Sequence, residues 1–408
     1  MSIFLLAVAE DTCLNQSLSH RVQNIKPSPT LAITARAAAL KAAGQDIIGL
    51  GAGEPDFDTP QHIKQAAIDA INAGFTKYTA VDGTPQLKAA ICRKFARDNN
   101  LSYKPSQVLV SCGGKHSFFN LAQALLNSGD EVIIPAPYWV SYPDMVQLAE
   151  GVPVIIEAGI EAGFKITPAQ LEAAITPRTK LMVINSPSNP TGVTYSKAEL
   201  LALGAVLSRH PHVLVATDDI YEHNLFGDEP FINILTACPQ LVERGIVLNG
   251  VSKTYSMTGW RIGYAAGPEW LIKAMTNIQS QSTSNPTSIS QVAATAALDG
   301  DQTCIKEMVA AFKTRHDYVL GRLNAMPGLH CLPSQGAFYS FPDCREAIRT
   351  LGLKDDLALA EQLITQAGVA VVPGTPFGAP GYMRLSFATS MDNLRKALDR
   401  IEAFLRKA

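Results

Sequence analysis

A lysine directly follows an apolar segment of the chain, and its amine is the first group suited to chemistry. Lys253 comes after Gly245–Leu248, which has the composition of a buried strand, and Ser252 precedes it. Burying an ammonium is costly, but an amine at such a place can act as a nucleophile toward an aldehyde. Taken alone, Lys253 is better interpreted as a lysine in a surface turn, so its neighbours must decide.

Two further charged residues lie close to segments of the same kind. Arg261 stands eight residues after the lysine, between Gly259 and Gly263, and its planar fork suits a phosphate dianion. Asp218 closes the apolar segment Val213–Ala216, at the end of a strand where ligands of α/β proteins bind. An aspartate there can pair with a protonated pyridine nitrogen. A structural salt bridge and a turn cap are the competing interpretations.

Two turns add hydrogen-bond donors. The segment 185–192, Asn-Ser-Pro-Ser-Asn-Pro-Thr-Gly, is a rigid turn in which the amide of Asn189 can donate to a phenolate oxygen. The segment 111–115 contains Gly113 and Gly114 between a strand and a helix, where free backbone N–H groups and the helix dipole favour an anion. Each turn is also compatible with a plain loop.

Trp139 and Arg384 complete the set. Trp139 follows the apolar segment Glu131–Pro135 and can stack on an aromatic cofactor, although a core position is the commoner use of tryptophan. Arg384 lies inside the apolar strand pattern Met383–Phe387, where a charge needs a partner. Either the α-carboxylate of a substrate or a structural carboxylate would serve.

The elements that must position these residues form a regular alternation between about residues 105 and 267. Helical patterns such as Ser117–Asn127 and Lys197–Ser208 separate short apolar segments, and Ser196 with Glu199 has the spacing of a capping box. Such strands predict an α/β fold whose mostly parallel sheet is covered by helices on both faces. The seven predicted strands are Val108–Val110, Glu131–Pro135, Val152–Ile156, Leu181–Ile184, Val213–Ala216, Gly245–Leu248 and Ile262–Ala265.

After about residue 300 the pattern changes to that of a smaller α+β domain. We expect a helix over Asp301–Asn324, a strand at Ala337–Phe341 and a helix near Asp356–Ala367. Strands at Val369–Val372 and Met383–Phe387 and a terminal helix follow. The early segment Asp46–Leu50 is an isolated strand, and whether it joins the C-terminal domain is open at this stage.

Length and composition exclude several classes of function. A chain of 408 residues suggests about two domains, and its net charge of −2 argues against a nucleic-acid partner. Seven cysteines without a C-x-x-C pair predict neither a disulfide framework nor a metal site. The apolar run Ile3–Ala9 lacks a charged leader and is too short to span a bilayer. We therefore expect a cytoplasmic protein that acts on small molecules, with no membrane partner.

In this order along the chain, the segments resemble the fold-type-I aminotransferases, which use pyridoxal 5′-phosphate, and specifically the class-I family of bacterial aspartate aminotransferases. The resemblance runs from about Arg21 to the C-terminus. The motifs that carry it are Gly-Ala-Gly-Glu-Pro-Asp-Phe-Asp-Thr-Pro (51–60), Asn-Pro-Thr-Gly (189–192), Ser-Lys (252–253) and Thr-Gly-Trp-Arg-Ile-Gly-Tyr (258–264).

The resemblance implies a seven-stranded large domain, a smaller domain built from both chain ends, and a homodimer with active sites at the interface. It implies an N-terminal extension over 1–20 that is poorly ordered, an arm and part of the small domain over 21–64, a large pyridoxal-phosphate domain over 65–298 and a small domain over 299–408.

The resemblance also implies a role for each matching residue. Lys253 would form the Schiff base with the cofactor and then shuttle a proton. Asp218 would pair with the pyridine nitrogen, because the aspartate of the family precedes its tyrosine, here Tyr221, by three positions. Asp219 is left without a role. Tyr221 and Asn189 would hydrogen-bond the phenolate oxygen of the cofactor.

The remaining implied contacts concern the ring, the phosphate and the substrate. Trp139 would stack on the ring. Both Trp139 and Asn189 would also contact the substrate. Arg384 would bind the α-carboxylate of the substrate, assisted by the backbone of Gly53. The implied phosphate cradle consists of Gly113, Gly114, Ser252 and Arg261, together with Tyr78 of the partner subunit.

Two lysines bear on the choice of substrate. Lys115 follows the glycine turn, where the resemblance implies contact with the distal carboxylate of an acidic substrate. This favours transfer from L-aspartate to 2-oxoglutarate, giving oxaloacetate and L-glutamate. Lys26 lies in a segment that some relatives associate with transamination of prephenate to arogenate, and it could hold one carboxylate while Arg384 holds the other.

Other functions compete with this one. A pyridoxal-phosphate β-lyase or decarboxylase would use the same lysine and aspartate, and a broad alanine or aromatic aminotransferase would share the whole site. A regulator with an aminotransferase-like domain would carry a DNA-binding module, and we do not expect one because only about twenty residues precede the match.

Overall fold

The computed structural model describes residues 18–25, 29–227 and 229–407. Its centre is a seven-stranded sheet in the order β2-β8-β7-β6-β5-β3-β4, in which β8 runs antiparallel to both neighbours and the other pairs are parallel. All seven strands predicted from the sequence are present. They are β2 (Val108–Ser111), β3 (Glu131–Ala136), β4 (Val152–Glu157), β5 (Thr179–Asn185), β6 (Leu214–Asp218), β7 (Gly245–Gly250) and β8 (Gly263–Ala266).

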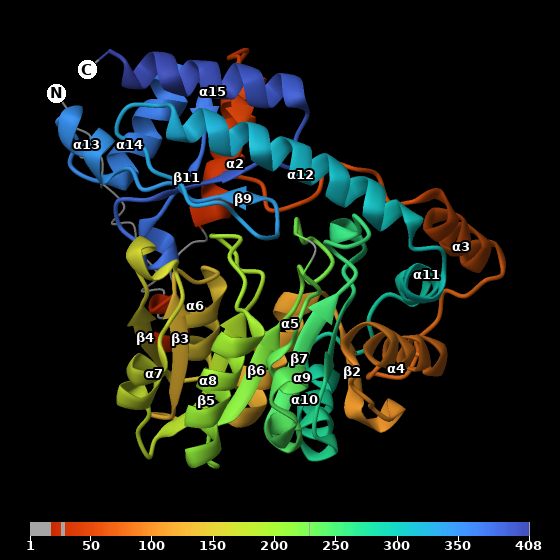
Figure 1. Ribbon diagram of the computed structural model, residues 1–408. Coiled ribbons are helices and arrows are strands. Elements are labelled where there is room, and N and C mark those ends of the chain that lie inside the picture. The colour runs from red at the N-terminus through yellow and green to blue at the C-terminus, as the bar shows by residue number, and fades with distance from the viewer. Residues whose placement is uncertain (1–17, 26–28, 228, 408) are drawn as a thin grey trace, which may run out of the picture.

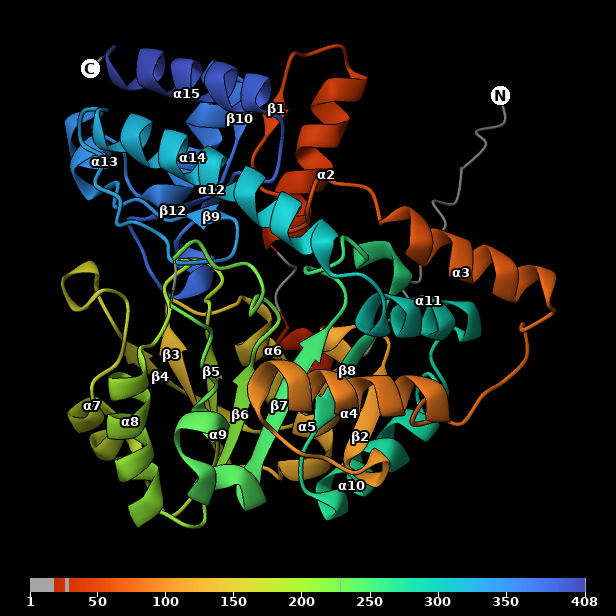
Figure 2. The ribbon, with the colours of Figure 1, turned by 45° about the vertical axis from the view of Figure 1, so that its right-hand side comes forward.

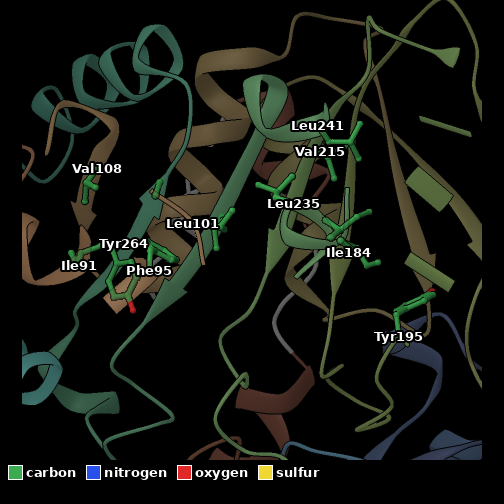
Figure 3. Packing of buried hydrophobic residues seen from close by; sticks show 14 of the residues in the cluster. Ile91, Phe95, Leu101, Val108, Ile184, Tyr195, Val215, Leu235, Leu241 and Tyr264 are labelled. Atoms are coloured by element: carbon green, nitrogen blue, oxygen red, sulfur yellow. The ribbon is translucent and has the colours of Figure 1, made fainter. Parts of the chain in front are cut away.

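Helices cover the sheet on both faces because side chains alternate along each strand. On β6 and β5, Val215 and Ile184 point into one buried cluster with Leu235, whereas Val183 points into the other with Phe118. Figure 3 shows the first cluster between the strands and their covering helices. The helices on that face include α3 (Gln61–Asn72), α4 (Pro85–Asn99), α7 (Pro168–Ala174), α8 (Lys197–Arg209), α9 (Ile234–Ala237) and α11 (Ser288–Asp299), and those on the other face include α5 (Gly114–Leu125), α6 (Ser141–Leu148) and α10 (Glu269–Ser280).

A smaller α+β unit lies against the carboxyl edge of the sheet, drawn above it in Figure 1. Its three-stranded sheet has the order β11-β12-β9. A second pair joins β1 (Ile48–Gly49) to β10 (Val369–Ala370) in parallel, so the isolated early strand does join the C-terminal elements. The other elements are α2 (Pro29–Ala42), α12 (Thr303–Asn324), β9 (Tyr339–Ser340), α13 (Arg345–Thr350), α14 (Asp356–Gln362), β11 (Val372–Pro373), β12 (Met383–Ser386) and α15 (Met391–Leu405).

Local chemistry explains where this unit departs from the predicted boundaries. The helix predicted from Asp301 begins at Thr303, and the carboxylate of Asp301 lies just before the helix and accepts from the Thr303 N–H at 3.0 Å. The strand predicted over 337–341 is confined to 339–340, and Ala337 has a left-handed φ of 59° that interrupts extended pairing. The capping box of α8 is confirmed, since Ser196 accepts from the Glu199 N–H at 3.3 Å and Glu199 accepts from the Ser196 N–H at 2.7 Å.

The remaining regular elements are short. They are α1 (His20–Gln23), the 3₁₀ turns η1 (Pro105–Gln107), η2 (Ile160–Ala162), η3 (Pro239–Arg244), η4 (Thr258–Trp260) and η6 (Thr375–Phe377), and the π-helical turn η5 (Leu363–Ala367). Among the described residues, no helix has both the length and the apolar character needed to cross a bilayer. Figure 2 shows the loops at the carboxyl ends of the strands facing the smaller unit, which is where the chemically interesting residues gather.

Candidate active site

A cavity of about 360 Å³ opens where the parallel strands end and the smaller unit begins. This is the edge of the sheet at which α/β folds bind ligands. The lining residues come from the carboxyl ends of five strands of the large sheet (β2, β3, β5, β6 and β7), from the segment after β1, and from two strands of the smaller sheet. They are Gly53, Gly114, Lys115, Trp139, Val140, Ser141, Asn185, Asn189, Asp218, Ile220, Tyr221, Ser252, Lys253, Thr258, Arg261, Tyr339 and Arg384.

Lys253 lines the cavity just beyond β7, and its Nζ donates a hydrogen bond to the carbonyl of Gly53. Burial above all, together with the positive charges of Arg261 and Arg384, lowers the pKa of this amine to about 8, against an opposing effect of Glu54. A lower pKa leaves more of the amine neutral near pH 7, which is the form that attacks a carbonyl group. The lysine therefore lies in a setting suited to a nucleophile.

Asp218, the last residue of β6, presents its carboxylate to the same cavity. Burial raises its pKa to about 6, although hydrogen bonds from the Tyr142 hydroxyl, at 2.5 Å, and the Ile220 N–H, at 3.3 Å, oppose the rise. The side chain of Asn185 donates to the Asp218 carbonyl at 2.9 Å and holds the strand end. In the part of the chain that the structure describes, no basic side chain forms an ion pair with the Asp218 carboxylate, so this carboxylate can pair with a cationic ring nitrogen.

The N-terminus of α5 forms an anion-binding corner. Gly113 has a φ of 89°, and a Cβ there would collide with the guanidinium of Arg261. Arg261 itself adopts a left-handed φ of 57° and donates to the carbonyls of Thr258, at 3.0 Å, and Cys112, at 3.3 Å. Free helix N–H groups, a guanidinium and the Ser252 hydroxyl surround one end of the cavity, and this donor set fits a phosphate dianion.

Arg384 on β12 is 2% exposed and has no ion-pair partner among the described residues. It donates to the side-chain oxygen of Asn189 at 2.8 Å and to the carbonyl of Gly51 at 2.7 Å, and its Nε has no hydrogen-bond partner. Its guanidinium also lies 4.4 Å from the ring centre of Tyr339 and 5.1 Å from that of Phe377. A buried charge without a counterion is costly, so the structure favours an external carboxylate over a structural one.

The orientation of Asn189 follows from this contact. A guanidinium can only donate, so the amide oxygen of Asn189 must face Arg384 and its nitrogen must point elsewhere. Asn185 accepts from the Asn189 backbone N–H at 2.8 Å and holds the turn. The hydroxyl of Tyr221, which is buried, lies 2.7 Å from the hydroxyl of Tyr339.

Trp139 and Lys115 line the side of the cavity nearest α5. The ammonium of Lys115 lies 5.2 Å from the centre of the Trp139 ring, a cation–π arrangement. Burial and the charge of Arg261 lower the pKa of Lys115, against a weaker opposing effect of Asp144. Lys115 thus gives the cavity a second basic side chain besides Arg384, from α5 and not from the smaller unit.

The structure brings most predicted site residues together, but not all. Tyr78 is 92% exposed and does not line the cavity of this chain, so its proposed contact with a second copy stays a prediction. Lys26 lies outside the described residues. Asp219, left without a role by the sequence, turns away from the cavity and accepts from the Thr217 hydroxyl at 2.6 Å and from Asn233.

Sequence reasoning missed Tyr142 and Tyr339. Tyr142 lies in the helical pattern of α6 and Tyr339 in a short strand, and both are buried like ordinary core residues. Their hydroxyls contact Asp218 and Tyr221, which are 76 and 118 residues away in the sequence. No local pattern marks such a contact.

Comparison with known proteins agrees with this arrangement. The sequence profile described as "Aminotransferase class I and II" matches residues 45–401. An aspartate/prephenate aminotransferase of Nitrosomonas europaea is 62% identical over 394 residues, covering 95% of this chain and 99% of its own. The crystal structure of the aspartate aminotransferase from Rhizobium meliloti superposes with a TM-score of 0.92 at 49% identity, covering 96% and 99%. The aspartate aminotransferase of Thermus thermophilus with maleate has a TM-score of 0.90 at 45% identity, covering 96% and 100%.

Proposed function

The chain belongs to the class I and II aminotransferases, a family that depends on pyridoxal phosphate, and we propose that it transfers the amino group of L-aspartate to 2-oxoglutarate. The products would be oxaloacetate and L-glutamate. The observation that carries the proposal is one cavity holding Lys253, an amine of lowered pKa, and Arg384, a buried cation with no ion-pair partner.

The donor set of the cavity supports pyridoxal phosphate as the cofactor of this chain. When bound, the cofactor supplies an aldehyde for the amine and a ring that accepts electrons from the Cα of the substrate. Lys253 would hold it covalently through Nζ, and the corner formed by Gly113, Gly114 and Arg261, with Ser252, would hold its phosphate. Asp218 would pair with the ring nitrogen, while Tyr221 and the free amide nitrogen of Asn189 would donate to the phenolate oxygen, and Trp139 would stack on the ring.

The two ends of the cavity support an acidic substrate. Arg384 would bind the α-carboxylate as a two-pronged donor, with the backbone of Gly53 beside it. Lys115 would bind the distal carboxylate. Burial lowers the pKa of Lys115 because it makes the charged ammonium unfavourable, and a bound carboxylate would offset that cost. A relative crystallised with maleate, a four-carbon dicarboxylate, supports a substrate with two carboxylates.

Once displaced from the cofactor by the substrate, Lys253 would move the proton at Cα. Its lowered pKa favours the neutral amine that can accept a proton near pH 7. Asp218, as a carboxylate, would keep the ring nitrogen protonated, and the cationic ring would then stabilise the negative charge that develops at Cα when this proton leaves. The smaller unit, which contributes Arg384, would orient Cα toward the lysine.

A second copy of the chain would complete the phosphate site. Tyr78 is a large aromatic residue left 92% exposed, in the segment that leads into α4. We place it, as Tyr78 of the partner subunit, against the cofactor phosphate, which makes the protein a homodimer. We also assign the protein to the cytoplasm, since the six described cysteines are all free thiols, as a reducing compartment would keep them.

Replacing Lys253 tests the core of the proposal. The purified protein with pyridoxal phosphate should show a visible absorption band, and borohydride should fix the cofactor to the peptide containing Lys253. Lys253→Ala should lose both the fixation and at least about 10⁴-fold in kcat, beyond what one general base usually contributes. Lys273→Ala, an exposed lysine on α10, is the matched control and should behave as the unaltered protein. A Lys253→Ala protein that transaminates at the normal rate would overturn the proposal.

The substrate requires its own measurement. Coupled assays should detect oxaloacetate and glutamate from aspartate and 2-oxoglutarate. Release of ammonia or carbon dioxide in stoichiometric amounts instead would identify a lyase or a decarboxylase and would overturn the aminotransfer reaction.

Prephenate is a second candidate substrate, favoured by the relative that is named for both activities. Prephenate has two carboxylates, and Arg384 would hold one while Lys26, outside the described residues, would hold the other. Lys26→Ala should then weaken turnover of prephenate more than turnover of aspartate. No detectable arogenate with the unaltered protein would eliminate this second activity.

A further inference from the structure

Tyr339 has no part in the roles assigned so far, yet it lies at the centre of the site. Its side chain is fully buried on β9 of the smaller unit and lines the cavity. Its hydroxyl lies 2.7 Å from that of Tyr221, and its ring lies 4.4 Å from the guanidinium of Arg384. One residue thus contacts both the arginine assigned to the substrate and the tyrosine assigned to the cofactor.

The Tyr339 hydroxyl packs closely against Gly53 and Tyr221. A Cβ at Gly53 would lie 3.0 Å from this oxygen, so a side chain larger than glycine would press on it. The rings of Tyr221 and Tyr339 are edge-on, with centres 5.8 Å apart, which leaves the two oxygens as the polar contact between them. Among the described residues, the Tyr221 hydroxyl is the hydrogen-bond partner of the Tyr339 hydroxyl.

Counting hydrogens assigns a direction to this bond. Each hydroxyl has one hydrogen. If Tyr221 donates its hydrogen to the phenolate oxygen of the cofactor, as proposed above, the hydrogen between the two tyrosines must come from Tyr339. Donation into the Tyr221 oxygen polarises that hydroxyl and strengthens its own outward bond.

The positive charge of Arg384 affects how readily the Tyr339 hydroxyl donates its hydrogen bond. Burial raises the pKa of the Tyr339 phenol, and the guanidinium on its ring works against that rise, which makes the hydroxyl a better donor. The other charged groups that face the two tyrosines are Glu54, which acts on Tyr339, and Asp218, which acts on Tyr221. A carboxylate bound to Arg384 would cancel part of the guanidinium charge and weaken the donation.

We propose that Tyr339 is a positioning residue that couples the substrate arginine Arg384 to the cofactor contact of Tyr221, through its ring on one side and its hydroxyl on the other. The inference rests on the proposed function. Filling of Arg384 weakens the hydrogen bond from Tyr339, hence that from Tyr221, and so raises the proton affinity of the cofactor-linked nitrogen at Lys253.

Two substitutions separate the hydroxyl from the ring. Tyr339→Phe keeps the ring against Arg384 and removes the donor. The pH midpoint of the visible absorbance of the cofactor-loaded protein should rise by about half a unit to one unit, the size of one ordinary hydrogen bond. The KM for aspartate should stay within about twofold, because the cation–π contact remains. Tyr339→Leu also removes the ring, so its KM should rise about 2- to 30-fold.

Succinate, a dicarboxylate without an amino group, probes the coupling directly. Saturating succinate should raise the midpoint of the unaltered protein, and this rise should be smaller in Tyr339→Phe. Tyr103→Phe is the matched control, since the Tyr103 hydroxyl is buried without a hydrogen-bond partner and lies outside the cavity. It should leave the midpoint, the succinate response and the KM unchanged.

The outcomes distinguish this inference from the proposed function. A Tyr339→Phe midpoint within about 0.2 units of the unaltered value, far less than one hydrogen bond is worth, with a full succinate response would overturn the coupling and leave the aminotransferase intact. An equal rise in KM for the Phe and Leu variants would do the same. Absence of a visible band in the unaltered, cofactor-treated protein would overturn the proposed function, and the coupling with it.

Discussion

Two groups of charged residues lie on opposite sides of the loop that follows β6, and they differ in how their charges are paired. Lys253 and Arg384, on the cavity side, have no ion-pair partner among the described residues. On the other side, against α4, Lys94 forms an ion pair with Glu222, which also accepts from Asn99 and Asn249 at 2.7 Å. One loop thus separates charges without counterions from the Lys94–Glu222 ion pair.

The residues 218–222 show how a short segment serves both groups. Asp218 and Tyr221 line the cavity, while Asp219 and Glu222 are buried on the α4 side. Burial by itself raises the pKa of Glu222, but the charges of Lys94 and His223 outweigh it and bring the pKa below its usual range. An unpaired buried charge costs stability and is retained where a ligand will pair with it. The comparison indicates that the Lys94–Glu222 pair stabilises the fold, whereas Lys253 and Arg384 are available to bind ligands.

The strongest test removes an unpaired charge. Arg384→Gln should lower kcat/KM for aspartate by about 10²- to 10⁴-fold, because it removes a buried partner of the substrate carboxylate. The thermal midpoint should fall by no more than about 2 °C, since the arginine is not paired within the protein. Steady-state kinetics and thermal unfolding measure both. Arg395→Gln, an exposed arginine on α15, should change neither quantity, and a large loss of stability with normal kinetics in Arg384→Gln would contradict the comparison.

The opposite result is expected for the paired group. Lys94→Met removes the lysine partner of the buried Glu222 and leaves it only His223 as a basic neighbour among the described residues. The variant should reduce the free energy of unfolding by about 3–5 kcal/mol, while kcat/KM of the folded protein stays within about threefold, a change of less than 1 kcal/mol. Denaturant titration of the cofactor-loaded protein measures the loss. The double variant Lys94→Met/Glu222→Gln removes both charges and should recover most of it.

A surface ion pair on the same helix provides the control. Arg93 bonds to Asp299 at 2.6 Å, with its side chain 58% exposed. Arg93→Met should cost at most about 1 kcal/mol. If the double variant is no more stable than Lys94→Met, the network holds the fold through packing and not through charge.

The lowered pKa of Lys253 predicts the pH dependence of cofactor uptake. Only the neutral amine attacks the aldehyde, so the uptake rate of cofactor-free protein should rise about tenfold per pH unit below the pKa and level off above it. The plateau should begin near pH 8. Stopped-flow absorbance between about pH 6 and 10 measures this rate, and a rise that continues to the ordinary pKa of lysine would show that burial does not perturb this amine.

The smallest effect concerns acid. Because the folded pKa of Glu222 lies below its unfolded value, the unfolded chain binds more protons, and stability falls as pH falls. The stabilisation from Glu222 should be complete above the ordinary glutamate pKa and decline below it by at most about 1.4 kcal/mol per pH unit. The difference in unfolding free energy between the unaltered protein and Glu222→Gln should shrink over that range. A difference that stays constant with pH would argue against a perturbed carboxylate.

Much of the site could be predicted from the sequence, because parallel strands place their carboxyl ends at one edge. Asp218, Asn189, Lys253 and Trp139 each follow an apolar segment, and the structure brings all of them to one cavity. Arg384 stood out as a charge within an apolar strand, and only the structure shows that none of the described carboxylates pairs with it. The roles given to Tyr78 and Lys26 stay predictions.

The sequence by itself determined the seven strands, the turns that end them and the order of chemical groups along the chain, because composition and period record which segments are buried. Only the tertiary structure decided that β1 joins β10, that Asp219 turns away from Asp218's cavity, and that Tyr339 meets Tyr221 and Arg384. The physical reason is that such contacts join residues far apart in the chain, and their partners are selected by the packing of whole elements and not by any neighbouring residue.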